Sequence, residues 1–173
     1  MRTAPRSKSS RPLSVLHCVA YHHLLPLLYH RCQLLALFLI VAIGSGGDVV
    51  IPPEIDGKQV TAIGNIVGSV GAFEECDTIT SVVIPDGVTE IQDNAFYSCT
   101  ALETATIPAS VTLLRNCAFD GCTNLRAVYF EGDAPRLANY VFVSVEDVTM
   151  YYQEGTSGWS NPWHGRPAEL YEP

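Results

Sequence analysis

The sequence predicts an α/β-type repeat solenoid, a right-handed coil of about four turns with a short parallel β-sheet and an aromatic C-terminal cap. The first observation behind this prediction is self-similarity: residues 84–106 and 107–129 are identical at nine of 23 positions, where chance would give roughly one or two. The second is that the phase continues, since steps of 23 lead from Phe96 back to Phe73 and from Phe119 on to Phe142.

The repeats also divide the chain. Ile51-Pro52 opens a longer first copy, whose extra residues fall in two places, before Val60 and between Ile63 and Phe73. Both insertions spare the apolar positions, as expected for loops. We therefore expect a leader at 1–45, a solenoid at 46–152 with coils at about 49–81, 82–104, 105–127 and 128–152, and a cap at 153–173.

Each copy predicts one short strand. Ala105 and Ile107 alternate with polar residues ahead of Pro108, so they should face inward before the proline ends the ladder. The equivalent inward pairs are Val82/Ile84 and Val128/Phe130. The apolar residues that follow the strand, Val88, Ile91, Ala95 and Phe96, have near-helical spacing and predict a single turn of α- or 3₁₀-helix. Stacked copies would bury these side chains about 4.8 Å apart along a parallel ladder.

The pattern I-P-x-x-V-T-x-[IL]-x-x-x-A-F-x-x-C-x-x-L, which recurs in phase along the chain, resembles the BspA-like class of bacterial leucine-rich repeats. GGDVVIP followed by DGKQVTAIG is similar to the lengthened first copy of that class, and the tail from Thr149 to Tyr171 is similar to its closing segment. The resemblance covers about 46–173. It implies a horseshoe-like leucine-rich-repeat solenoid on an exported or cell-surface protein, with roles in adhesion or protein binding.

The leader differs in charge and hydropathy from the rest. Five bases and no acid precede Asp48, so this part carries +5. The apolar run 33–43, QLLALFLIVAI, is too short to span a bilayer as a helix and suits a secretory signal. The long basic region ahead of it indicates either a start codon assigned too far upstream or a longer membrane anchor that also uses Leu13–Leu28. The alternative to an export signal is that the apolar run forms a buried helix. Export predicts an extracellular or cell-surface protein that meets the membrane only through this segment.

Composition and motifs exclude several functions. From Asp48 onward the chain has 18 acids and five bases, a charge of −13 that would repel phosphate backbones, so nucleic acid is not an expected partner. His164 is the one histidine in this part, and no nucleophile–base–acid set accompanies it. We therefore expect no enzyme activity, no cofactor and no metal.

Three cysteines, Cys76, Cys99 and Cys122, recur in phase. A linear ladder cannot surround a metal tetrahedrally, and neighbouring coils lie too far apart for an ordinary disulfide. The prediction is three small buried apolar side chains. Cys117 is out of phase and is expected in a loop.

The tail is rich in aromatic residues: Tyr151, Tyr152, Trp159, Trp163 and Tyr171. They could stack on sugar rings or anchor a partner, but a solenoid must also cover its last coil, and we favour a cap. Val148, Met150 and Tyr152 should face inward from the last strand, alternating with Thr149 and Tyr151.

A binding site should lie on the sheet face that points away from the core, because residues there vary on a fixed scaffold. Ser81 and Ala127 are expected on this face. The proposed partner-binding residues are Thr80, Val83, Glu103, Thr104, Thr106, Arg126 and Tyr129. Arg126 and Tyr129 are the best anchors, since such residues dominate binding hot spots. The sequence thus predicts a non-catalytic module that binds a protein partner or a host or matrix surface. The alternatives are a structural piece of a larger surface array and carbohydrate binding through the tail.

Overall fold

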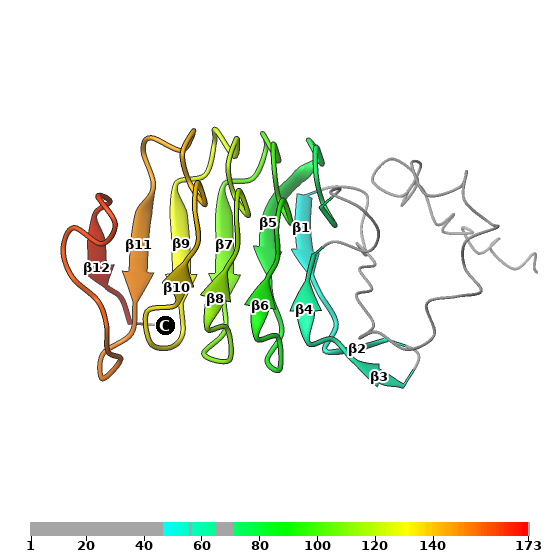
Figure 1. Ribbon diagram of the computed structural model, residues 1–173, viewed down its shortest axis with the longest axis horizontal. Coiled ribbons are helices and arrows are strands. Elements are labelled where there is room, and N and C mark those ends of the chain that lie inside the picture. The colour runs from blue at the N-terminus through cyan, green and yellow to red at the C-terminus, as the bar shows by residue number, and fades with distance from the viewer. Residues whose placement is uncertain (1–46, 56, 65–70, 173) are drawn as a thin grey trace, which may run out of the picture.

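A six-stranded parallel sheet runs the length of the repeat array (Figure 1). The computed structural model describes residues 47–55, 57–64 and 71–172, so the expected leader lies outside the described residues. The strands of this sheet, in spatial order, are β1 (Gly47–Val50), β5 (Ile79–Val83), β7 (Thr104–Ile107), β9 (Ala127–Phe130), β11 (Thr149–Tyr152) and β12 (Ala168–Leu170).

The pairing register repeats the sequence period. Val83 pairs with Thr106 and Thr106 with Tyr129, so each partner is the equivalent residue of the next copy. The inward positions are apolar as predicted: Val82, Ala105 and Val128 are buried. The chain is therefore a leucine-rich-repeat-type solenoid in which each copy adds one strand.

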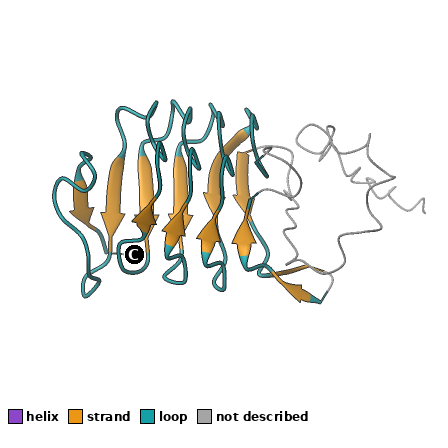
Figure 2. Cartoon of the chain, viewed as in Figure 1, coloured by secondary structure: helices purple, strands orange, loops and turns teal. Residues whose placement is uncertain are grey.

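A second parallel sheet of four very short strands forms the opposite wall of the coils (Figure 2). Its strands, in order, are β10 (Arg136–Leu137), β8 (Leu113–Leu114), β6 (Glu90–Ile91) and β4 (Ala62–Ile63). The predicted turn of α- or 3₁₀-helix is therefore wrong: Ile91 lies in an extended strand, and Ala95 and Phe96 lie in hydrogen-bonded turns. No helix occurs anywhere in residues 47–55, 57–64 and 71–172.

The segment around Ala95 and Phe96 shows why a helix does not form. The amides of Ala95 and Tyr97 donate to carbonyls three residues back, at 3.3 and 3.0 Å. The amides that alternate with them donate to the next coil instead: Phe96 to the Ala118 carbonyl at 2.8 Å and Ser98 to that of Asp120 at 2.8 Å. Because every second donor leaves the local chain, an α-helical ladder cannot continue.

Backbone conformation enforces the same pattern in each copy. Asn94, Cys117 and Tyr140 occupy the same position in successive copies, and all have φ between 55° and 62°. Non-glycine residues seldom adopt this left-handed region, so the same turn recurs although the side chains differ. Cys117 thus lies in a turn, as predicted.

Four phenylalanine rings form a column through the core. The ring centroids of Phe73, Phe96, Phe119 and Phe142 are separated by 5.0, 5.1 and 5.5 Å, and successive rings lie within 8° of parallel. Each ring is 3% exposed or less. Burying such a ring contributes roughly 1.5–3 kcal/mol relative to leaving it in water, so the column is a main source of stability, and the predicted stacking is confirmed.

The two ends of the array depart from the repeat. The longer first copy carries a hairpin of β2 (Glu54–Ile55) and β3 (Lys58–Gln59), as expected for an insertion in a loop. At the other end, Tyr129 pairs with Tyr151, a step of 22. Met150 is buried as predicted, but β11 is not the last strand, since β12 pairs with it and extends the sheet.

Candidate interaction surface

The outward positions of the six-stranded sheet form columns across the strands. One column contains Val83, Thr106, Tyr129 and Tyr151 at consecutive register positions. Val83 is 38% exposed, and the other three are half-buried. The structure therefore brings three of the proposed partner-binding residues, Val83, Thr106 and Tyr129, into one line.

A second column passes through Ser81, Thr104 and Ala127. Ser81 and Thr104 are half-buried, and Ser81 Oγ donates to Asp48 Oδ1 at 2.6 Å. Ala127 lies on this face as expected, in register with Thr104, but it is only 8% exposed. Its register partners on the two neighbouring strands, Thr104 and Thr149, carry larger side chains.

The remaining proposed residues, Thr80, Glu103 and Arg126, follow one another at the start of the strands, where Glu103 N donates to Thr80 O and Arg126 N to Glu103 O. Arg126 is exposed, but its Nη1 donates to the Thr123 carbonyl at 3.1 Å and lies 3.4 Å from that of Leu125. Its guanidinium is therefore held against its own loop. The one ion pair found among the described residues lies elsewhere, between Arg115 and Glu90 at 3.0 Å.

A tyrosine cluster, Tyr129, Tyr151 and Tyr171, occupies the C-terminal half of this face. The rings of Tyr129 and Tyr151 stack at 5.1 Å with planes 17° apart. The ring of Tyr171 meets both nearly at right angles, at 5.2 and 6.4 Å. The sequence predicts Tyr151 and Tyr171 as part of the cap. For Tyr151, the alternation with the inward residues of its strand was the one sequence signal for this face. The position of Tyr171 depends on β12, which the repeat pattern does not predict.

The other tail aromatics close the end of the core. Trp163 is 4% exposed and contacts Phe130 at 5.6 Å between centroids. Trp159 stacks on Tyr152 at 5.1 Å, and its indole N–H donates to the Gly132 carbonyl at 3.3 Å. These contacts confirm the predicted aromatic cap.

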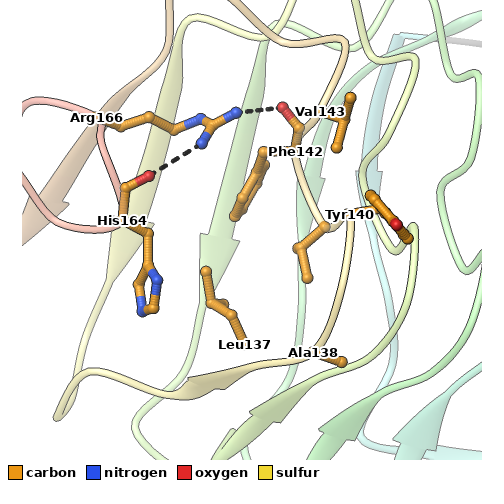
Figure 3. Close-up of a pocket in the computed structure, with 8 residues that line it drawn as sticks. Leu137, Ala138, Tyr140, Phe142, Val143, His164 and Arg166 are labelled. Carbon is orange, nitrogen blue, oxygen red and sulfur yellow. Dashed lines mark hydrogen bonds between the residues drawn. The ribbon is translucent and has the colours of Figure 1, made fainter.

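Arg166 fastens the cap to the last turn of the array (Figure 3). Its Nη2 donates to the carbonyl of Phe142 and its Nη1 to that of His164. The guanidinium carbon lies 5.4 Å from the centre of the Phe142 ring, within cation–π range. Burial lowers the pKa of Arg166 from its usual value, but arginine stays charged at any ordinary pH.

The hollow of about 190 Å³ beside Arg166 contains His164, Tyr140 and Val143 on its lining (Figure 3). The guanidinium beside it is directed at the backbone carbonyls of Phe142 and His164. No group of three potential metal-ligating side chains occurs within the described ranges. None of the described residues forms a helix able to cross a membrane.

The cysteine column is buried as predicted. Cys99 and Cys122 are free thiols and donate to the carbonyls of Phe73 and Phe96 at 2.9 and 3.1 Å. Cys76 is disulfide-bonded, so the prediction of three unbonded thiols is wrong for that residue.

A polar ladder that was not predicted from the sequence supports the turns. The backbone N–H of Asn116 and its side-chain Nδ2 both donate to Asp93 Oδ1, at 2.9 and 3.0 Å. Its own Oδ1 accepts from the amide of Asn139 at 3.2 Å. These three residues occupy the same position in successive copies, and this recurrence of Asp or Asn in the sequence could have predicted the ladder. Side chains of this ladder satisfy backbone donors that the turns would otherwise leave unpaired.

Comparison with known protein families identifies the repeats. Residues 59–156 match a family model described as a BspA type leucine rich repeat region, in six copies. Among solved structures, the chain is similar to the crystal structure of a leucine-rich repeat protein from T. pallidum, with 23% identity and a TM-score of 0.48. The match covers 63% of this chain and 60% of that one. No curated protein matches the chain.

Proposed function

The chain belongs to the BspA-type leucine-rich-repeat family, and we propose that it is an exported, non-catalytic module that binds a protein partner on the outer face of its six-stranded sheet. Repeats of this type are generally protein-interaction modules, and in bacteria they are typically found on surface or secreted proteins. The seven proposed partner-binding residues all belong to this sheet or to the residues directly before its strands.

The observation that carries the proposal is the tyrosine cluster. Tyr129 and Tyr151 are partly exposed and stack on each other outside the core. The core is already closed at this end by Trp163 and Phe130, so the cluster is not needed as a cap. Tyrosine is among the residue types enriched at binding hot spots.

Site-specific photo-crosslinking tests the proposal. A benzoylphenylalanine placed at Thr106 or at Tyr129 in the full chain should capture the same protein in the producing cell or its surroundings. The matched control position is Thr89, which is exposed beside β6 on the opposite wall. The purified captured protein should then bind the wild type and bind Tyr129→Ala at least tenfold more weakly.

Two results would contradict this function. Equal capture from Thr89 would show that the outer face is not selective. A purified partner that binds Tyr129→Ala and wild type equally would remove the tyrosine cluster from the interface. The structural alternative, a piece of a larger surface array, predicts no capture from either face.

A further inference from the structure

We infer that the tyrosine cluster receives a lysine or arginine side chain of an extended protein segment, which packs on the open face of the Tyr129 ring above Thr106. This inference rests on the proposed function and deepens it by naming the partner's chemistry. Its basis is the orientation of the rings, the height of the neighbouring side chains and the charge of the face.

Ring orientation leaves one face of Tyr129 open. Tyr129 and Tyr151 are register partners, and their rings stack 5.1 Å apart, close to the distance between neighbouring strands. The ring planes therefore stand across the column, and Tyr151 covers one face of Tyr129. The opposite face looks along the column toward Thr106, the register partner on β7.

The side chain at that position is short. Thr106 is followed along the column by Val83. Both are small β-branched residues, so their side chains extend less far from the sheet than that of Tyr129. This step gives a shelf on which a side chain can lie against an aromatic face. Tyr171 supports the wall, since it contacts the Tyr129 ring edge-on and accepts a hydrogen bond from Gln153 at 3.1 Å.

The charge of this face favours a cation. Glu131 follows Tyr129 at the next outward position, and Glu169 is the register partner of Tyr151 on the side away from Thr106. Both are exposed. Arg126, the base proposed for this face, is held by the carbonyls of its own loop. A cation over a tyrosine face is attracted by the ring quadrupole, and nearby carboxylates add to the attraction.

A neutral ligand fits the same observations less well. Sugars also stack on aromatic rings, but the carboxylates of Glu131 and Glu169 would help to bind an uncharged sugar only through direct hydrogen bonds to its hydroxyl groups, whereas they attract a cation without direct contact. Within the described part of the chain, Tyr129 and Tyr151 make their side-chain contacts through their rings. Their hydroxyl groups can therefore hydrogen-bond the backbone of a bound segment.

The test uses a fluorescein-labelled octapeptide of alternating serine and lysine, with the full-length protein. The matched probes are the same peptide with every lysine acetylated, and chitohexaose as an uncharged sugar. Fluorescence anisotropy and calorimetry should show binding of the lysine peptide that weakens as salt is raised. The acetylated peptide and the sugar should bind at least tenfold more weakly.

Substitutions on and off this face locate the site. Tyr129→Leu and Thr106→Leu should each weaken binding about three- to tenfold, the first by removing the aromatic face and the second by filling the shelf. Tyr129→Phe keeps the ring and should restore most of the affinity. Glu131→Gln combined with Glu169→Gln should weaken binding, whereas Glu146→Gln, an exposed acid outside this face, should not. Thermal melts verify that each variant is folded.

The inference is overturned if Thr106→Leu and Tyr129→Leu bind the lysine peptide as wild type does, or if the acetylated peptide binds equally. Stronger binding of chitohexaose would make the cluster a sugar site instead. If the lysine peptide fails while photo-crosslinking remains specific to Thr106 and Tyr129, the proposed function stands and only the cationic partner is lost. Failure of both would remove the function as well.

Discussion

The Sγ of Cys122 donates a hydrogen bond to the backbone carbonyl of Phe96, in the preceding coil. Cys99 makes the same contact with Phe73. Each thiol therefore links one coil to the aromatic residue of the coil before it. The cysteine column and the phenylalanine column act as one core, in which a polar backbone group is satisfied by a nearly apolar side chain.

Replacing Phe96 with alanine should remove the centre of the aromatic column. Phe96 is fully buried and stacked on both sides, so we expect a loss of about 3–5 kcal/mol in the free energy of unfolding. Urea denaturation followed by circular dichroism measures it. Tyr140→Ala is the control, since Tyr140 is 67% exposed. A loss below about 1 kcal/mol for Phe96→Ala would show that the column is not essential.

Stability should fall at alkaline pH because of the buried thiols. The hydrogen-bonding neighbour Cys122 and then burial raise the pKa of Cys99 far above its usual range. The folded protein keeps this thiol protonated, whereas the unfolded chain ionises near a pH of about 8.5. The stability from this group is therefore complete below about pH 8.5 and is lost as pH rises, by up to about 1.4 kcal/mol per pH unit.

Urea midpoints between pH 7 and 10, without reductant, measure this dependence. Cys99→Ala should flatten the alkaline decline, while Thr100→Ala, an exposed neighbour, should leave it unchanged. An identical decline in Cys99→Ala would assign the effect to other groups.

Arg166→Met should loosen the cap. The substitution removes the hydrogen bonds from the guanidinium to the carbonyls of Phe142, Val145 and His164. Because hydrogen bonds that involve a charged group contribute about 1.5–3 kcal/mol, we expect a loss of that order. Hydrogen exchange should rise at Ala168 in β12 and stay constant at Val82 in β5. Arg136→Met is the matched control, because Arg136 is exposed. Unchanged exchange in β12 would mean that the aromatic contacts alone hold the cap.

Trp163→Ala should destabilise the whole array by about 3–5 kcal/mol, since the ring is buried and packs against Phe130. Trp159→Ala should also lower the melting temperature, by less, because Trp159 is half-buried. Scanning calorimetry gives both values. A Trp159→Ala protein that melts as wild type does but has lost a glycan-array signal would favour the carbohydrate alternative over the cap.

The repeat made much of the fold predictable. A constant period places identical side chains at identical depths, so the phenylalanine column and the inward strand residues followed from alignment. The second sheet did not, because strands as short as Glu90–Ile91 carry no alternation. The spacing of Val88, Ile91 and Ala95 also mimics a helix. Their true conformation is decided by hydrogen bonds to the next coil, which no single copy reveals.

The candidate surface was only half predictable. Tyr129 was found because it lies in a column that varies beside constant apolar neighbours. Its partners were missed, since Tyr151 is displaced by one position from the phase of the repeats. Tyr171 follows a strand outside the repeats. Arg126 looked like an anchor from its residue type alone, whereas its contacts show a guanidinium engaged with its own loop.

The alternation of donors in the turns has a consequence for how such a chain can change in length. Each copy offers amides to the copy after it, as Phe96 and Ser98 do to Ala118 and Asp120, so adding or losing a fraction of a copy would leave donors facing no acceptor. The array can therefore gain or lose only complete copies of the repeat. The slip in phase at β11 falls where the phenylalanine column has already ended and a different closure takes over.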